Sequence, residues 1–293
     1  MNNISKLNFI FIFNFIILIF VFNALAIDRN IPKTDEAWAK AMQSLNWKKG
    51  PLVVNYNQAN SKIDFSNNFS ILEGEQAHQM LFWVNGTDFD YVDVYAMGIN
   101  SEQYLFNYTD SGYVKKDDWT DVDPNKFIKE IKENYKASNE VRKNNGQPYV
   151  TNVTWKKKPY LDGIYNSVYY ALDVSWSDNT SSVEGTSIIL GREGYTTGKY
   201  IGGDNGYSEQ MLLNISKMHK FNSTKEYKDW KSGDKVAAAG IGALLATTLG
   251  VKALKPGIIA AGLLLLKKFW FLIFLPFIWL GNLFKGSGKK KKK

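Results

Sequence analysis

Two apolar segments near the ends of this 293-residue chain limit what the part between them can be. The first, Phe9–Phe22, follows Lys6 and is followed by Ala24-Leu25-Ala26. A positive residue, a short apolar run and a small-x-small sequence are the three parts of a secretory signal peptide. The run has 14 residues, fewer than the roughly 20 that span a bilayer comfortably. We therefore expect residues 1–26 to be a signal peptide and the rest to be exported; an uncleaved N-terminal anchor is the alternative.

The second apolar region lies in the C-terminal part of the chain and is broken by lysines. Residues 236–251 and 257–266 are rich in small residues and Leu, and residues 269–284 are rich in Phe, Ile and Leu. Lys267 and Lys268 precede the last block. Placing both at a bilayer centre would cost about 5–7 kcal/mol, so they belong at an interface.

A single membrane crossing accounts for this pattern most simply. We expect residues 269–284 to be a transmembrane anchor, with Trp270 and Trp279 at the interfaces and Lys267, Lys268 and Lys285 reaching toward water. Residues 236–268 would form small-residue or amphipathic helices associated with the membrane. The poly-Lys tail, residues 285–293, stays in the cytoplasm by the positive-inside rule. Residues 27–235 then face the periplasm from a bacterial inner membrane; a re-entrant helix pair is the alternative.

The positive charge of the chain belongs to its tail rather than to the exported part. The chain has 36 Lys and Arg against 28 Asp and Glu, a formal net charge of +8. Eleven of the basic residues lie outside residues 27–235, which leaves 25 basic and 28 acidic residues there, a net charge of −3. Because the exported part is mildly acidic, we do not expect a nucleic-acid partner.

The absence of cysteine narrows both the chemistry and the compartment. With no Cys and only two His, disulfides, zinc–thiolate sites and thiol nucleophiles are excluded, and we predict no metal or cofactor. The 209 residues between 27 and 235 suffice for one large core. They include seven Trp, seven Phe and all 16 Tyr, which supply core area without cross-links. A cysteine-free exported domain is typical of a bacterial periplasm.

The order of strand and helix patterns in the exported part is irregular, which predicts an α+β fold with mixed or antiparallel strands and a few helices in one domain. The clearest helix begins at Pro124, after Asp123 as N-cap, and runs to about Lys143. We expect Tyr104–Tyr108 and Gly112–Val114 to form a hairpin. The other expected strands are Pro51–Tyr56, Ile63–Phe65, Tyr91–Met97, Tyr149–Trp155, Ser167–Trp176 and Gly185–Leu190, and the other expected helices are Leu72–Trp83 and Gln210–Lys220.

Several short sequences, in this order along the chain, resemble a bacterial family of predicted membrane-anchored proteins, the domain-of-unknown-function 2167 family. They are Ser111–Asp118, Asn139–Gly146, Lys158–Asp162, Leu190–Gly194 and Ser232–Gly240. The resemblance covers most of residues 38–285. Departures such as Tyr170-Ala171, where the family has Trp-Ala, indicate a divergent member. The resemblance implies an exported domain held by a C-terminal helix; it implies no activity, cofactor or catalytic residue.

Two local patterns have both a ligand-binding and a structural interpretation. Arg192 lies between Gly191 and Gly194, in a loop that either presents it to an anionic ligand or is a tight turn with Arg192 in an ion pair. An acidic cluster precedes the helix at Pro124 and offers oxygen ligands for Ca²⁺, although acidic residues there are ordinary caps. Its members are Asp117, Asp118, Asp121 and Asp123. We favour the structural interpretation of both patterns.

No assembled catalytic set is evident, so we expect a non-enzymatic domain that binds another envelope protein or a cell-wall component. The alternative is a carboxylate hydrolase acting on cell-wall glycan or peptide. It needs two carboxylates about 5–9.5 Å apart, and its candidates are Asp90, Asp93, Asp162 and Asp173. A third hypothesis places the function in the membrane part, where Gly240, Gly242, Ala246 and Gly250 would let helices pack closely in a homo-oligomer.

Overall fold

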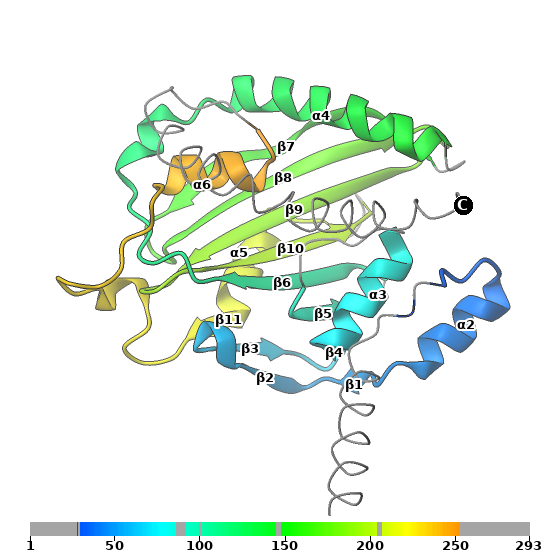
Figure 1. Cartoon of the computed structure of the whole chain (residues 1–293), viewed down its shortest axis with the longest axis horizontal. Coiled ribbons are helices and arrows are strands. Elements are labelled where there is room, and N and C mark those ends of the chain that lie inside the picture. Colours follow the sequence, from blue (N-terminus) through cyan, green and yellow to red (C-terminus); the bar gives the residue numbers. More distant parts are fainter. Residues whose placement is uncertain are drawn as a thin grey trace, which may run out of the picture.

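The computed structural model describes residue 28 and residues 30–85, 92–99, 101–144, 148–203 and 207–251. The expected signal peptide (1–26) and transmembrane anchor (269–284, with Trp270, Trp279 and the flanking Lys267, Lys268 and Lys285) lie outside these residues. Within them, no helix combines the length and the apolar character that a membrane crossing requires. The described part is built on a large sheet with helices on both faces (Figure 1).

The large sheet has eight antiparallel strands and spans the domain. Their order is β1 (Lys48–Lys49), β4 (Ser70–Glu73), β5 (Val94–Met97), β6 (Gln103–Thr109), β10 (Tyr195–Gly202), β9 (Ser181–Leu190), β8 (Ser167–Trp176) and β7 (Val150–Asp162). Tyr195 lies opposite Thr109 and Leu190, and Ser167 lies opposite Ile189. The β7–β8 and β9–β10 turns and the end of β6 therefore meet at one end of the sheet, called here the loop end.

A small sheet and several helices cover the two faces of the large sheet. The small sheet contains β11 (His219–Phe221), β3 (Ser61–Phe65) and β2 (Leu52–Tyr56). The α-helices are α2 (Asp35–Ser44), α3 (Glu75–Asn85), α4 (Pro124–Asn144), α5 (Glu209–Met218) and α6 (Ile241–Thr248), and the short 3₁₀ helices are η1 (Asn57–Ala59), η2 (Asp117–Asp121) and η4 (Tyr227–Asp229). Helices α3, α4 and α6 pack on one face; α5 and the small sheet pack on the other.

Each face has its own hydrophobic core because side chains alternate across a strand with period two. On β8, Val168 and Tyr170 face α4 and α6, whereas Ala171 between Tyr170 and Leu172 faces α5. Two glycines allow α5 to approach the sheet closely. A Cβ on Gly198 of β10 would collide with Ile215 of α5, and one on Gly185 of β9 would lie 2.5 Å from a methyl group of Leu212.

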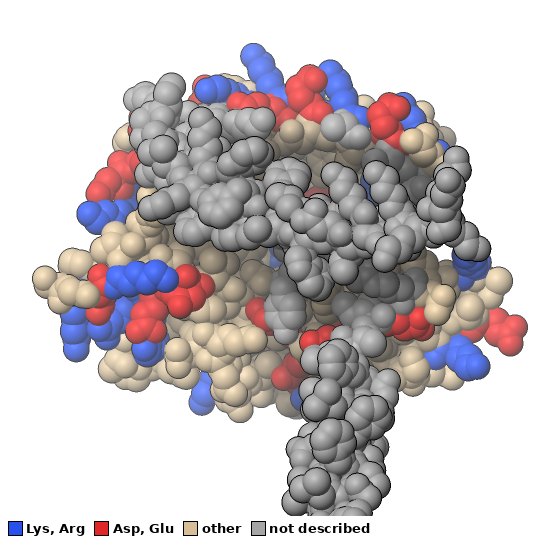
Figure 2. Space-filling view, viewed as in Figure 1, with Lys and Arg blue, Asp and Glu red and all other residues tan. Residues whose placement is uncertain are grey.

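The structure confirms the α+β class and most of the expected elements. Helix α4 begins at Pro124, and the Asp123 carboxylate accepts the backbone N–H groups of Asn125 and Lys126 at 2.9 and 3.2 Å. The Asp123 cap satisfies two of the N–H groups that the first turn of a helix leaves open. The outer face of α4 mixes charges of both signs (Figure 2), including an ion pair between Lys136 and Glu133 at 2.7 Å.

Two of the expected elements were wrong. Leu72–Trp83 is not one helix, because residues 70–73 form β4 and α3 begins at Glu75 after Gly74, whose φ is +56°. The expected hairpin partner of β6, Gly112–Val114, is not a strand of the large sheet. Its Tyr113 instead forms a parallel bridge with Val236, which is more than a hundred residues away in the sequence. Strand β10 and helix α2 were not expected.

Helix α6 packs in the core of the domain, although residues 236–251 were expected to form a membrane-associated helix. Ile241 and Leu245 of α6 are fully buried between α4 and the face of the large sheet. The Asp118 carboxylate accepts the N–H groups of Gly242 and Ala243 at 2.9 and 3.1 Å. The described domain thus continues to Val251 rather than ending at residue 235.

Candidate functional site

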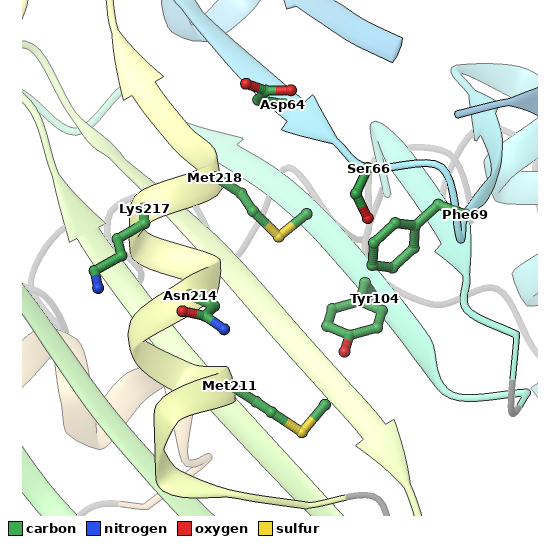
Figure 3. Close-up of a pocket in the computed structure, with 8 residues that line it drawn as sticks. All are labelled: Asp64, Ser66, Phe69, Tyr104, Met211, Asn214, Lys217 and Met218. Atoms are coloured by element: carbon green, nitrogen blue, oxygen red, sulfur yellow. The ribbon is translucent and has the colours of Figure 1, made fainter. Parts of the chain in front are cut away.

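A groove of about 410 Å³ lies between α5 and the end of β3 (Figure 3). Its lining comes from four parts of the chain: Asp64, Ser66, Phe69, Tyr104, Met211, Asn214, Lys217 and Met218. In Figure 3, Met211, Asn214 and Met218 extend from α5 toward the rings of Phe69 and Tyr104. We call this hollow the α5 groove.

The amphipathic character of α5 places these side chains. Leu212 and Ile215 are fully buried against the large sheet, on the side made accessible by Gly185 and Gly198. Met211, Asn214 and Met218 recur at the spacing of three and four residues that gives one helix face, and that face lines the groove. One face of α5 is therefore packed in the core, and another face lines the groove.

The wall of the α5 groove that lies across from α5 is formed by aromatic rings in edge-to-face contact. The rings of Phe69 and Tyr104 meet edge to face at 5.2 Å, and Tyr104 meets Tyr200 at 5.5 Å. Burial raises the pKa of the Tyr104 hydroxyl, with a further contribution from Glu102. Tyr104 is therefore a neutral phenol at any physiological pH. The groove combines two flexible thioethers and two rigid rings with polar groups at its rim, which suits an amphiphilic ligand.

The loop end of the large sheet brings together four of the short sequences that resemble the DUF2167 family. Gly112 donates its N–H to the carbonyl of Glu193 (2.8 Å), and Tyr113 donates its N–H to the carbonyl of Lys235 (2.8 Å). The fourth sequence arrives through the β7–β8 turn, where the Lys116 ammonium donates to Asn166 Oδ1 (2.7 Å). Three of these sequences, spread over more than a hundred residues, are thus joined by hydrogen bonds, and the fourth leads into the adjoining turn.

Comparison with known proteins identifies the family of this chain. The profile of a family described as proteins of unknown function, DUF2167, matches residues 46–278. The chain belongs to this family. None of the curated proteins compared with it matches. The solution structure of cyanobacterial PsbP (CyanoP) from Synechocystis sp. PCC 6803 is similar with 14% sequence identity and a TM-score of 0.33, over 58% of this chain and 92% of that one.

In this DUF2167 member, Arg192 is part of the junction at the loop end. Its Nε and Nη2 donate to the two carboxylate oxygens of Asp234 at 2.6 and 2.7 Å, and its Nη1 donates to the carbonyl of Thr224 at 3.2 Å. Hydrogen bonds from the guanidinium lower the pKa of Asp234 to about 2. Bidentate pairs of this kind fix geometry. The contacts favour the turn with an ion pair over an anion-binding loop.

The acidic cluster before α4 also has structural partners. Asp123 caps α4, and Asp118 caps α6 from a distant part of the chain. Gly240 and Gly242, which were expected to pack helices of different molecules, are in contact with Asp118 of this chain, and a Cβ on Gly242 would lie 2.8 Å from the Asp118 carbonyl oxygen. In the described part of the chain, no three His, Asp or Glu side chains gather as metal ligands do.

The candidate carboxylates of a hydrolase lie far apart. Asp162 pairs with Ser167 at the start of β8, and Asp173 lies six residues further along that strand, roughly 20 Å away at 3.4 Å per residue. Asp93 precedes β5, which is four strands from β8, again roughly 20 Å at 4.8 Å per strand. Asp90 is outside the described residues. These three carboxylates therefore cannot share one substrate bond.

The described candidates are also engaged in local bonds. Asp162 Oδ1 accepts the N–H groups of Ile164 and Tyr165 in its own turn. The buried Asp93 carboxylate accepts the hydroxyl of Tyr56 and the N–H of Tyr108. Burial nevertheless raises the pKa of Asp93, against the effect of these two hydrogen bonds. The arrangement is that of a satisfied buried carboxyl group rather than an exposed catalyst.

The sequence singled out none of the eight residues that line the α5 groove. The helix itself was expected over Gln210–Lys220, and its Met-Asn-Met spacing was the one available signal. Phe69 and Asp64 lie in a connecting segment and a short strand, and nothing local relates them to a helix about 150 residues later. The groove exists only because β11, which follows α5 directly, pairs with β3.

Proposed function

We propose that this DUF2167 member is an exported, membrane-tethered domain without catalytic activity that holds a partner in the α5 groove. The domain faces the periplasm of a bacterial inner membrane, and residues 269–284 are its tether. The supporting observation is the groove itself, with an apolar wall of Phe69, Tyr104, Met211 and Met218 and a polar rim. The spacing of the candidate carboxylates gives no comparable support to a hydrolase.

The chemistry of the groove defines the partner that fits it. A volume of about 410 Å³ is at the lower end of ligand sites, which run from about 300 to 1,000 Å³. It suits a few apolar side chains of an extended segment better than a whole sugar chain. Methionines adapt to apolar groups of different shapes, while Asn214 and Ser66 offer hydrogen bonds that orient a backbone. The proposed partner is therefore a segment of another envelope protein.

A site-specific cross-link tests this proposal in cells. Because the chain has no Cys, Asn214→Cys gives a single thiol in the groove that can carry a benzophenone. Lys220→Cys is the matched control, because Lys220 is exposed on β11 just beyond α5. We expect illumination of membranes to give a discrete protein adduct from position 214 and none from position 220.

A blocking substitution decides whether that adduct forms in the groove. Ser66→Trp places a large side chain at the rim without changing the core, since Ser66 is exposed. The adduct from position 214 should fall at least tenfold in this background, with the unfolding midpoint unchanged. An adduct of equal yield from both positions, or one that survives Ser66→Trp, would contradict binding in the α5 groove.

A further inference from the structure

The β7–β8 turn exposes an isoleucine at its tip. Ile164 is 85% exposed, more than any other large apolar residue of the described chain. The turn that carries it is rigid, because Asp162 Oδ1 accepts the N–H groups of both Ile164 (2.8 Å) and Tyr165 (3.1 Å). An apolar side chain that stays in contact with water is less favourable in free energy than a polar side chain at the same position. Because single exposed apolar residues are common on protein surfaces, the residues around Ile164 decide whether it belongs to a contact surface.

Two tyrosines flank this tip and widen the apolar surface. Tyr160 is 50% exposed, and its ring lies 5.2 Å from that of Tyr169 on the neighbouring strand. Tyr165 follows Ile164 directly and is also exposed. A tyrosine has an apolar ring and a polar hydroxyl, and it is enriched where hydrocarbon meets water. At this tip, Ile164 is therefore suited to contact hydrocarbon, and Tyr160 and Tyr165 are suited to the boundary between hydrocarbon and water.

The charged groups around the tip are mainly basic. The exposed Lys217 ammonium lies 5.8 Å from the Tyr165 ring, and Lys158 is exposed two residues before Tyr160. Lys116 reaches the turn through its bond to Asn166. The nearby carboxylates are already engaged: Asp162 holds the turn, and Glu209 pairs with Lys157 at 2.7 Å. The lysines thus leave a net positive charge beside an apolar tip.

We infer that the β7–β8 tip docks on the surface of an anionic lipid bilayer. Ile164 enters the acyl boundary, Tyr160 and Tyr165 lie at the level of the headgroups, and Lys158 and Lys217 contact lipid phosphates. The inference rests on the proposed tether, which brings the domain to a bilayer. In this orientation the loop end faces the lipid. The α5 groove, beside Lys217, remains accessible to a partner from the side of the domain.

Site-specific fluorescence on the full chain tests the contact. A single environment-sensitive probe, such as a nitrobenzoxadiazole, is attached through Ile164→Cys in the cysteine-free chain. Ile99→Cys is the matched control, because Ile99 is 71% exposed in the β5–β6 turn at the opposite end of the sheet. Both variants are reconstituted in vesicles of phosphatidylcholine alone or with 30% phosphatidylglycerol.

The expected result is a blue shift and at least a threefold gain of emission at position 164, only in the anionic vesicles, with quenching by a lipid-borne nitroxide. Position 99 should keep its emission in water. Lys158→Glu with Lys217→Glu should abolish the effect. Equal, water-like emission at both positions in vesicle-bound protein would overturn the docking, as would a shift that needs native membrane proteins. Failure of the full chain to enter vesicles would instead contradict the proposed tether.

Discussion

Single buried residues tie the stability of the domain to pH, and His219 does so most directly. Its Nε2 lies 3.0 Å from Thr196 Oγ1, while no described group bonds its Nδ1. Burial lowers the pKa of His219 to about 3, below the ordinary value of about 6.5. A lowered histidine pKa means that the stability due to the neutral ring is complete above pH 6.5 and is lost as the pH falls toward 3.

The variant His219→Gln should therefore have a flatter dependence of stability on pH. Between pH 6 and pH 4 the wild-type chain should lose about 1.4 kcal/mol more per pH unit than the variant, which is the effect of one proton. Urea unfolding of both proteins at several pH values measures the difference. Parallel curves over that range would show that His219 is not buried in its neutral form.

The ion pair between Arg192 and Asp234 should hold the loop end together. Asp234→Asn removes a carboxylate oxygen that accepts from both Arg192 and the Lys231 N–H, so the thermal midpoint should fall by several degrees. Asp110→Asn, which removes the exposed pair with Lys235, should change it little. Since the pKa of Asp234 is lowered to about 2, the difference from Asp234→Asn should be present above pH 4 and vanish as the pH falls toward 2. Equal midpoints for all three proteins at pH 7 would contradict the role of this pair.

Among the elements, α6 gives the clearest test of where the domain ends. Leu245 is fully buried among residues of α4 and the large sheet, so Leu245→Ala should cost about 2–5 kcal/mol in the free energy of unfolding. The exposed Thr247 on the same helix is the control, and Thr247→Ala should stay within about 0.5 kcal/mol. Detergent or lipid should not change either value. A neutral Leu245→Ala would place α6 outside the folded core.

Helices and strands were predicted well where the sequence pattern that determines them lies within one continuous segment. Helix α4 follows from Asp123, Pro124 and an apolar face within 21 residues, and strand β8 and parts of β7 and β9 were expected from their own sequences. The expected hairpin at residues 109–112 failed because Tyr113 pairs with Val236, and no local pattern announces a partner at that distance. The apolar stretch 236–251 is equally ambiguous, because a helix covered by protein and one covered by lipid require the same side chains.

At the scale of the whole molecule, the sequence predicted the class of the fold, but it did not predict which distant segments meet. The sequence predicted an α+β domain and the family, and the profile match confirms the family. The α5 groove needed the fold, since Asp64, Tyr104 and Met218 meet only through the pairing of β3 with β11 and the crossing of α5. Export and tethering remain predictions from residues outside the described structure.

The most direct test of the whole account is the reactivity of one groove thiol in intact spheroplasts. Asn214→Cys and the control Lys220→Cys are treated with a membrane-impermeant maleimide, both in spheroplasts and as purified protein. We predict that both thiols react from outside, and that position 214 alone reacts several times more slowly in spheroplasts because a partner occupies the groove. No reaction at either position would contradict export of the domain, and equal rates at position 214 in both preparations would contradict an occupied groove.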